Sequence, residues 1–222
     1  MWCIPKVTPE FEKRLLDICS LYEQPLNPRQ PVVCFDEKNH QLLSTPHGSL
    51  AAKPKSQPRR TDYEYQREGV RNEFVIIEPK AGWRHIRSTN HRTGRDWAKM
   101  IKFIATKRYP NATKIHLIED NLNTHNPKYL TEVYGEEEAR KLLTRIKFHP
   151  TPTHASWLNQ AEIEIGIFSR QVLNKRLASD SELKREKDAY LKERNKNKAL
   201  ITWSFTVQKA QEKFKISSGI KE

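Results

Sequence analysis

The sequence has little that would suit a secreted or a membrane-spanning protein. It holds only three cysteines, Cys3, Cys19 and Cys34, and their odd number without CxxC spacing favours a reducing compartment. The start of the chain lacks the basic and apolar regions of a secretory signal. No apolar run approaches the roughly 18 residues needed to cross a bilayer. We therefore expect a soluble cytoplasmic protein with no membrane partner.

Spacing patterns typical of zinc sites are also missing. The histidines that could suggest zinc are His116, His149 and His154, yet neither HxxxH nor CxxC spacing accompanies them. The sequence shows no internal repeat and no long low-complexity tract. It contains five tryptophans and eight phenylalanines, although its mean hydropathy is only -0.83. At 222 residues it can form one sizeable α/β core, or one domain with a helical appendage.

Positive charge is abundant and concentrated in one block. The net charge is +13, and residues 51–114 hold 16 basic but only 6 acidic side chains. In this block the cations are interleaved with Trp83, His85, His91 and Trp97. Lysine and arginine supply most non-specific affinity for nucleic acid, so the block is a candidate DNA surface. A basic surface that is merely solvated is the alternative.

The pattern of apolar residues predicts alternating strands and helices. A stretch at 40–46 could pair beside the first strand, the stretch 53–60 is expected to be a mobile loop, and 126–146 to be helical in parts. We expect strands at 32–35, 72–79, 82–89, 114–120 and 146–150, and helices at 9–23, from Thr89 or Thr93 to about Arg108, at 156–176 and at 179–198. This order predicts an α/β fold whose sheet has antiparallel strands first and parallel strands later.

Three acids could meet at one place in such a sheet. Asp36 and Asp120 are each predicted to close a buried strand, where ligands bind in open α/β sheets, although each alone could be a turn residue. Glu162 and Glu164 flank opposite edges of the apolar stripe of the 156–176 helix. Helical geometry cannot choose between these two glutamates. A cluster of carboxylates would suit a hard divalent cation such as Mg²⁺ and a polyanionic substrate.

Three stretches carry a resemblance to a known family. VVCFDEKNHQL, HLIEDNLNTHNPKYL and FHPTPTHASWLNQAEIEI resemble the signature blocks of DDE transposases of the mariner superfamily, in its bacterial insertion-sequence branch. The resemblance implies a ribonuclease-H-like mixed sheet flanked by helices. It also implies that Asp36, Asp120 and Glu162 are catalytic and hold two divalent metals, Mg²⁺ or Mn²⁺ as a substitute. Glu37 and Glu119 alternate with the acids and are expected to face away.

The resemblance further implies a function and partners. The reaction would be DNA cleavage at transposon ends, followed by strand transfer into target DNA, by a homodimer assembled on DNA near the nucleoid. The alternatives are a non-enzymatic DNA-binding remnant of a truncated transposase and a ribonuclease-H-type RNA hydrolase. His125 could orient a phosphate or water, or could only satisfy backbone groups. Trp157 is expected to anchor the core or an interface.

The predicted organisation has three parts. Residues 1–30 would be a linker and helix remnant, 31–178 the catalytic domain and 179–222 a helical extension. Transposases of this type carry helix-turn-helix modules ahead of the catalytic domain. The residues before Asp36 leave room for little more than one helix, so we expect end-specific binding to be missing. A separately encoded or frameshift-joined amino-terminal half could supply it.

Overall fold

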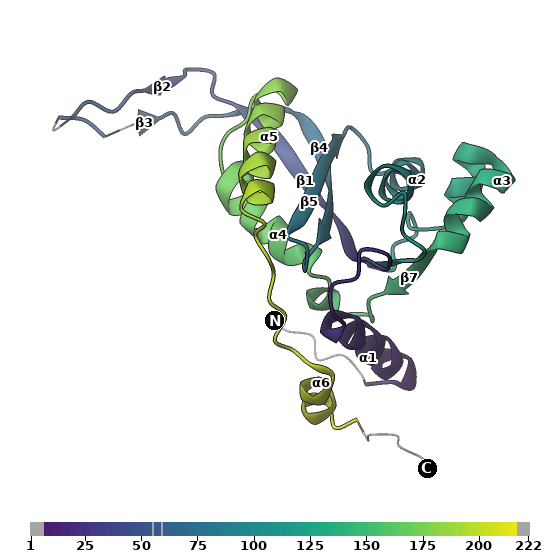
Figure 1. The fold of residues 1–222 in the computed structure, drawn as a ribbon. Helices are drawn as coiled ribbons and strands as arrows, with labels where there is room; N and C mark the ends of the chain where they lie inside the picture. Colours follow the sequence, from purple (N-terminus) through teal and green to yellow (C-terminus); the bar gives the residue numbers. More distant parts are fainter. Residues whose placement is uncertain (1–6, 55, 59, 217–222) are drawn as a thin grey trace, which may run out of the picture.

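A five-stranded mixed sheet forms the centre of the chain. The computed structural model describes residues 7–54, 56–58 and 60–216. The strands lie in the order β5-β4-β1-β6-β7 (Figure 1). Strands β1, β4 and β5 are antiparallel, whereas β6 and β7 run parallel to β1, as the sequence predicted. Their bounds are Val32–Ser44 for β1, Gln66–Glu78 for β4, Trp83–Thr89 for β5, Ile115–Glu119 for β6 and Ile146–Pro150 for β7.

Helices cover both faces of this sheet. α2 and α3 lie on one face, and α4 and α5 lie on the other, so the molecule has three layers (Figure 1). α1 and α6 pack against each other, and α1 also contacts β7. The helical segments are α1 (Pro9–Glu23), α2 (Gly94–Phe103), η1 (Ile104–Arg108), α3 (Lys128–Arg145), η2 (Ser156–Leu158), α4 (Ala161–Phe168), η3 (Ser169–Leu173), α5 (Asp180–Lys196) and α6 (Val207–Phe214). Among the described residues, no helix combines the length and apolar character that crossing a membrane requires.

Local sequence signals explain where several helices begin and bend. α2 starts after Thr93, whose side chain forms a reciprocal capping box with Asp96. α5 starts after Ser179, whose hydroxyl accepts a hydrogen bond from the amide of Glu182. α3 is kinked at Gly135, where φ is 80°, a value that glycine adopts without strain.

Several predicted boundaries were wrong, and β4, expected over 72–79, begins at Gln66. β1 continues to Ser44, so the stretch 40–46 extends the first strand instead of pairing beside it, and Asp36 lies in mid-strand rather than at a carboxyl end. Pairing with the long β4 extends β1 where the local apolar run has already ended. The helix predicted from 156 becomes α-helical only at Ala161, because Asn159 is extended and Asn159 Oδ1 accepts from the Ala161 amide.

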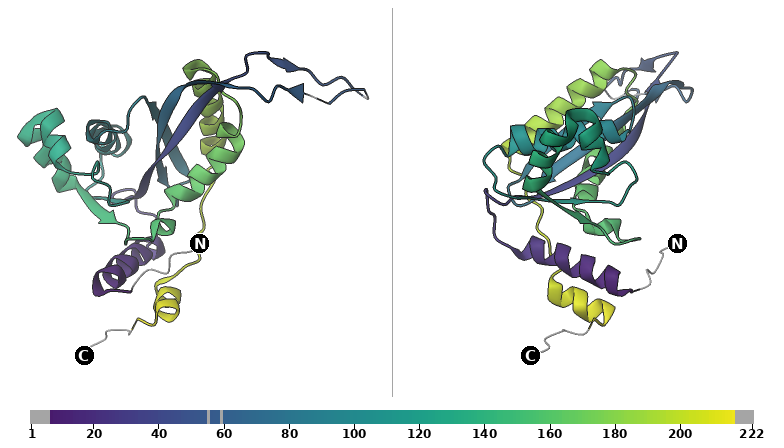
Figure 2. Two further views of the ribbon diagram at one scale, coloured as in Figure 1. Left: turned by 180° about the vertical axis from the view of Figure 1, so that it is seen from behind. Right: turned by 90° about the vertical axis from the view of Figure 1, so that its right-hand side faces the viewer.

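The stretch after β1 forms a two-stranded arm. β2 (Ser49–Leu50) pairs with β3 (Arg60–Thr61), and Lys53 forms an isolated bridge with Gln57. The arm projects from the body of the molecule (Figure 2). Part of the predicted loop 53–60 is therefore paired; its residues 55 and 59 lie outside the described residues.

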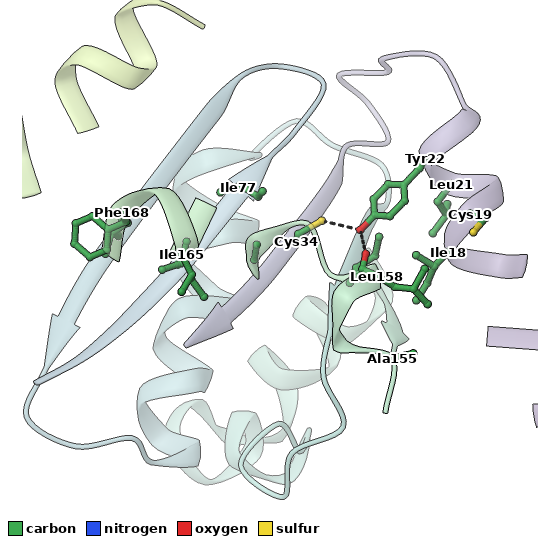
Figure 3. Packing of buried hydrophobic residues seen from close by; sticks show 14 of the residues in the cluster. Ile18, Cys19, Leu21, Tyr22, Cys34, Ile77, Ala155, Leu158, Ile165 and Phe168 are labelled. Carbon is green, nitrogen blue, oxygen red and sulfur yellow. Dashed lines mark hydrogen bonds between the residues drawn. The ribbon is translucent and has the colours of Figure 1, made fainter. Parts of the chain in front are cut away.

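The core on the α4 face joins distant parts of the chain. Tyr22 of α1 donates a hydrogen bond to the carbonyl of Leu158 at 2.7 Å, and its hydroxyl lies 3.2 Å from Cys34 Sγ (Figure 3). Trp157, expected to be an anchor, packs its ring against Phe205. Cys19 and Cys34 are buried thiols, whereas Cys3 lies outside the described residues.

Two neighbouring histidines of the sheet connect it to α1 through Asp17. His149 on β7 is 2% exposed; its Nδ1 contacts Asp17 of α1, and its Nε2 lies 3.0 Å from His116 Nδ1 on β6. Burial lowers the pKa of His149 and, together with the charge of its neighbours, that of His116. Because the pKa of both histidines is lower in the folded chain than in the unfolded chain, the unfolded chain binds more protons in mild acid.

We expect this pair to make stability depend on pH. The contribution of the pair to the free energy of unfolding should be complete above the ordinary histidine pKa near 6.5. It should decline as the pH falls below that value. The measurement is thermal unfolding between pH 7.5 and 5.5. The decline should be shallower in His149→Gln than in the parent, whereas exposed His91→Gln should match the parent. An equal slope in all three proteins would rule out the histidine pair as its source.

Candidate active site

Strand register brings Asp36 and Asp120 to the same level of the sheet. Parallel pairing sets Cys34 of β1 beside Ile118 of β6. Asp36 stands two residues farther along β1, so its side chain points to the face that carries Cys34. That face is the one covered by α4. Asp120 directly follows β6, and its charge acts on Asp36. The acids are thus adjacent even though Asp36 does not end its strand.

Asn159 fixes the segment that delivers Glu162 to this face. Its Nδ2 donates to the carbonyl of Phe35 at 2.8 Å and to Asp36 Oδ2 at 3.2 Å. Its Oδ1 accepts from the amide of Ala161, the first residue of α4. Glu162 therefore lies in the first turn of α4, exposed and close to Asp36. Asn159 lies within the FHPTPTHASWLNQAEIEI stretch, but no local signal distinguishes it from its neighbours.

The three acids repel one another electrostatically. Burial raises the pKa of Asp36 to about 7; its hydrogen bond from the Glu37 amide opposes this, and the charges of Glu162 and Asp120 raise it further. Burial likewise raises the pKa of Glu162; Lys38 opposes this and Asp120 adds to it. Each pair of the three acids is therefore close enough to interact. Their ligand atoms are nevertheless not all within 4.8 Å of one another in the described chain.

Glu164 points away from these acids into the protein. It is fully buried and forms ion pairs with Arg84 at 2.9 Å and with Arg194 at 2.7 Å. It also accepts a hydrogen bond from the hydroxyl of Tyr190 at 2.6 Å. These contacts use the carboxylate of Glu164 as a structural anion beneath α5. Helical periodicity left Glu162 and Glu164 equivalent, and the tertiary contacts separate them.

His125 occupies a buried position on the opposite side of Asp120. Its Nε2 lies 2.8 Å from Glu37 Oε1, and its Nδ1 lies 3.0 Å from the carbonyl and 2.9 Å from Oδ1 of Asp120. Burial alone would lower the pKa of His125, but its bonds to Asp120 and Glu37 and the charge of Glu119 raise it to about 11. Glu37 was expected to face away from the cluster, yet one of its carboxylate oxygens lies within 4.8 Å of one of Asp120, and both acids contact His125. Glu119 accepts a hydrogen bond from Trp97 Nε1 at 2.9 Å.

The side chain of His125 is only 1% exposed, so it is a counter-ion for buried acids rather than a group that meets substrate. We expect His125→Asn to weaken the binding of a divalent cation about 10- to 100-fold, because the loss of a residue that orients a ligating carboxylate typically has that effect. The measurement is Mn²⁺ affinity by titration calorimetry, with exposed His91→Asn as the control. An unchanged Mn²⁺ affinity would contradict a role in positioning Asp120.

The donor set fits a hard divalent cation. Asp120 Oδ1 is buried and has His125 Nδ1 at 2.9 Å as its counter-ion. The pKa of Asp36 is raised to about 7, first by burial and then by the charges of Glu162 and Asp120. A bound cation would oppose this rise, because it stabilises ionised carboxylates. Asp36, Asp120 and Glu162 are the residues that could hold it.

The basic block at 51–114 has fewer exposed, unpaired cations than its charge count suggests. Arg84 is buried against Glu164, and Arg108 lies 3.5 Å from Glu78 and stacks on Trp83. Arg71 is paired with Asp180 of α5. Several of the cations at 51–114 thus hold the fold together, because folding brings acids from other segments against them.

Comparisons with known proteins agree with this fold. A crystal structure of the Mos1 mariner paired end complex with Mn matches with a TM-score of 0.57 and 14% identity, covering 97% of this chain and 63% of that one. The Mos1 strand transfer complex matches with a TM-score of 0.56 and 12% identity, covering 97% and 62%. The chain thus spans less than two thirds of these relatives. Its sheet and flanking helices match the ribonuclease-H-like catalytic fold, as predicted.

A search of curated proteins finds no match. The model of one protein family, described as DDE superfamily endonuclease, matches residues 31–184. This match extends over more than half of the sequence and includes all three candidate acids. The chain therefore belongs to the DDE superfamily endonuclease family.

Proposed function

We propose that the protein is a transposase catalytic unit that cleaves DNA and transfers the freed strand to a target. The observation that carries this proposal is the approach of Asp36, Asp120 and Glu162 on one face of the sheet of an endonuclease family member. Three mutually repelling carboxylates are costly unless something binds them. A metal site for phosphodiester chemistry accounts for that cost.

The acids would bind metal, and neighbouring residues would position them. Asp36, Asp120 and Glu162 would hold two divalent cations, which supply activation of the attacking hydroxyl and neutralisation of the leaving oxygen. Asn159 sets the position of Asp36 and the start of α4, and His125 balances the charge behind Asp120. Mg²⁺ is the proposed ion, with Mn²⁺ as a substitute.

The partners and organisation complete the proposal. The substrate would be DNA, first transposon ends and then target, bound by a homodimer associated with the nucleoid. Residues 31–178 would form the catalytic part, with 1–30 and 179–222 packed on it. The bacterial insertion-sequence branch and a separately encoded helix-turn-helix half are further parts of the same proposal.

A nicking and strand-transfer assay tests the function. The protein is incubated with supercoiled plasmid and with a labelled duplex, in Mg²⁺, Mn²⁺ or EDTA. We expect metal-dependent products from the parent protein and none from Asp36→Asn, Asp120→Asn or Glu162→Gln. Equal residual activity in all four would refute the assignment. DNA binding without cleavage by a folded parent protein would favour the non-enzymatic remnant instead.

A further inference from the structure

Two exposed cations lie beside the acidic cluster and are not used by the fold. Lys38 stands two residues beyond Asp36 on β1 and shares its face, since Cys34 and Leu42 at the same parity are buried beneath α4. The pairing of β1 with β4 has no register shift between Cys34 and Leu42, so this alternation is regular. Lys38 is thus about 7 Å along the strand from Asp36.

The acid opposite Lys38 does not neutralise it. Glu73 of β4 is its register partner, but Glu73 is fully buried and its carboxylate is held by Ser88 at 2.7 Å and approached by Lys187 at 3.7 Å. Within the described residues, the ammonium of Lys38 has no carboxylate within 4.0 Å. The positive charge of Lys38 nevertheless acts on the cluster. Burial raises the pKa of Glu162, and the charge of Lys38 counteracts this rise.

Arg170 is the second cation and lies on the helix that carries Glu162. It follows Glu162 by eight residues, with Gly166 midway, so the three residues share one face across α4 and η3. A Cβ added at Gly166 would meet Arg170 Nη1 at 3.4 Å, which shows that the guanidinium lies back over Gly166 towards Glu162. Arg170 is exposed, and no carboxylate in the described part of the chain lies within 4.0 Å of its guanidinium.

Both cations lie on the same side of the acids. Asn159, before α4, contacts Phe35 and Asp36, whereas Leu177, after η3, accepts from the amide of Leu43 at 2.9 Å. The helical segment therefore runs along β1 in the direction from Asp36 to Leu43. Lys38 and Arg170 both lie in that direction from the cluster.

We propose that Lys38 and Arg170 bind backbone phosphates of the DNA strand that leaves the acidic cluster along α4. The inference rests on the proposed function. Each nucleotide of the strand carries a phosphate, so Lys38, about 7 Å along β1 from Asp36, would meet a phosphate close to the one at the acids. Such contacts fix the register of the strand without reading its sequence.

Salt-dependent DNA binding tests the assignment without requiring catalysis. Fluorescence anisotropy in EDTA measures the affinity of Lys38→Ala, Arg170→Ala and the double variant for a labelled duplex. Each lost phosphate contact should reduce the slope of log affinity against log salt by about 0.9 and, by the same relation, weaken binding about eightfold in 0.1 M salt. The double variant should lose about twice as much slope.

Matched variants make the result specific. Lys13 of α1 is exposed, and Lys13→Ala removes the same charge away from the acids; its slope should match the parent's. Lys38→Arg should retain the parent slope. Slopes for Lys38→Ala and Arg170→Ala equal to that of Lys13→Ala would overturn the inference, as would a change in metal affinity alone. An unaltered slope in protein that cleaves DNA rejects this inference only, whereas no cleavage by the parent rejects the function.

Discussion

Glu162→Gln is expected to reduce metal-dependent DNA cleavage about a thousandfold, and Asp36→Asn and Asp120→Asn to do the same. Metal-ion stabilisation of charge in phosphoryl transfer is worth several kcal/mol, and each 1.36 kcal/mol corresponds to tenfold in rate. Glu162 is exposed in the first turn of α4, and none of its described contacts supports the core. Its replacement should therefore change the free energy of unfolding by no more than about 0.5 kcal/mol.

The measurement combines the initial rate of plasmid nicking with thermal unfolding of the same preparations. Glu136→Gln, which changes an exposed acid of α3, serves as the control and should retain the parent rate. A rate for Glu162→Gln within a few fold of the control would remove Glu162 from the site. A large loss of stability would instead mean that the activity loss reports unfolding.

Glu164→Gln, unlike Glu162→Gln, is expected to lower the free energy of unfolding strongly. The buried Arg84 guanidinium would lose its anionic partner, and Arg194 and Tyr190 would lose theirs. Removing one partner of a buried ion pair costs about 3–5 kcal/mol, because the remaining charge stays buried. For a chain of this size that is a fall in Tm of about 10 °C. Thermal unfolding at pH 7.5 measures it.

A second variant separates lost charge from altered packing. In Glu164→Gln/Arg84→Met, both charges of the pair are absent, and the stability should recover in part relative to Glu164→Gln alone. If Glu164→Gln is as stable as the parent protein, the buried network does not hold α4 to α5. At a temperature where each variant is folded, cleavage by Glu164→Gln should stay close to that of the parent.

Much of the architecture could be read from local patterns. The helix expected from Thr89 or Thr93 begins after the capping box at Thr93, and the helix expected over 179–198 begins after Ser179. The apolar stripe of the helix expected at 156–176 is buried at Leu158, Ile165 and Val172. The change from antiparallel to parallel strands is confirmed. The boundaries failed where long-range contacts decide them: β1 extends because β4 pairs with it, and α4 starts late because Asn159 reaches back to β1.

Local patterns along the chain were enough to predict the order of the elements, the three motif acids and the excess of positive charge. Long-range contacts were needed to find that Glu164 belongs to a buried ion pair, that His125 contacts Asp120, and that Asp36 meets Asp120 from mid-strand. The physical reason is that periodicity fixes which face of an element is apolar, a local property. The pairing of β1 with β6 and the contact of His125 with Glu37 join residues more than 80 positions apart, and no local pattern encodes them.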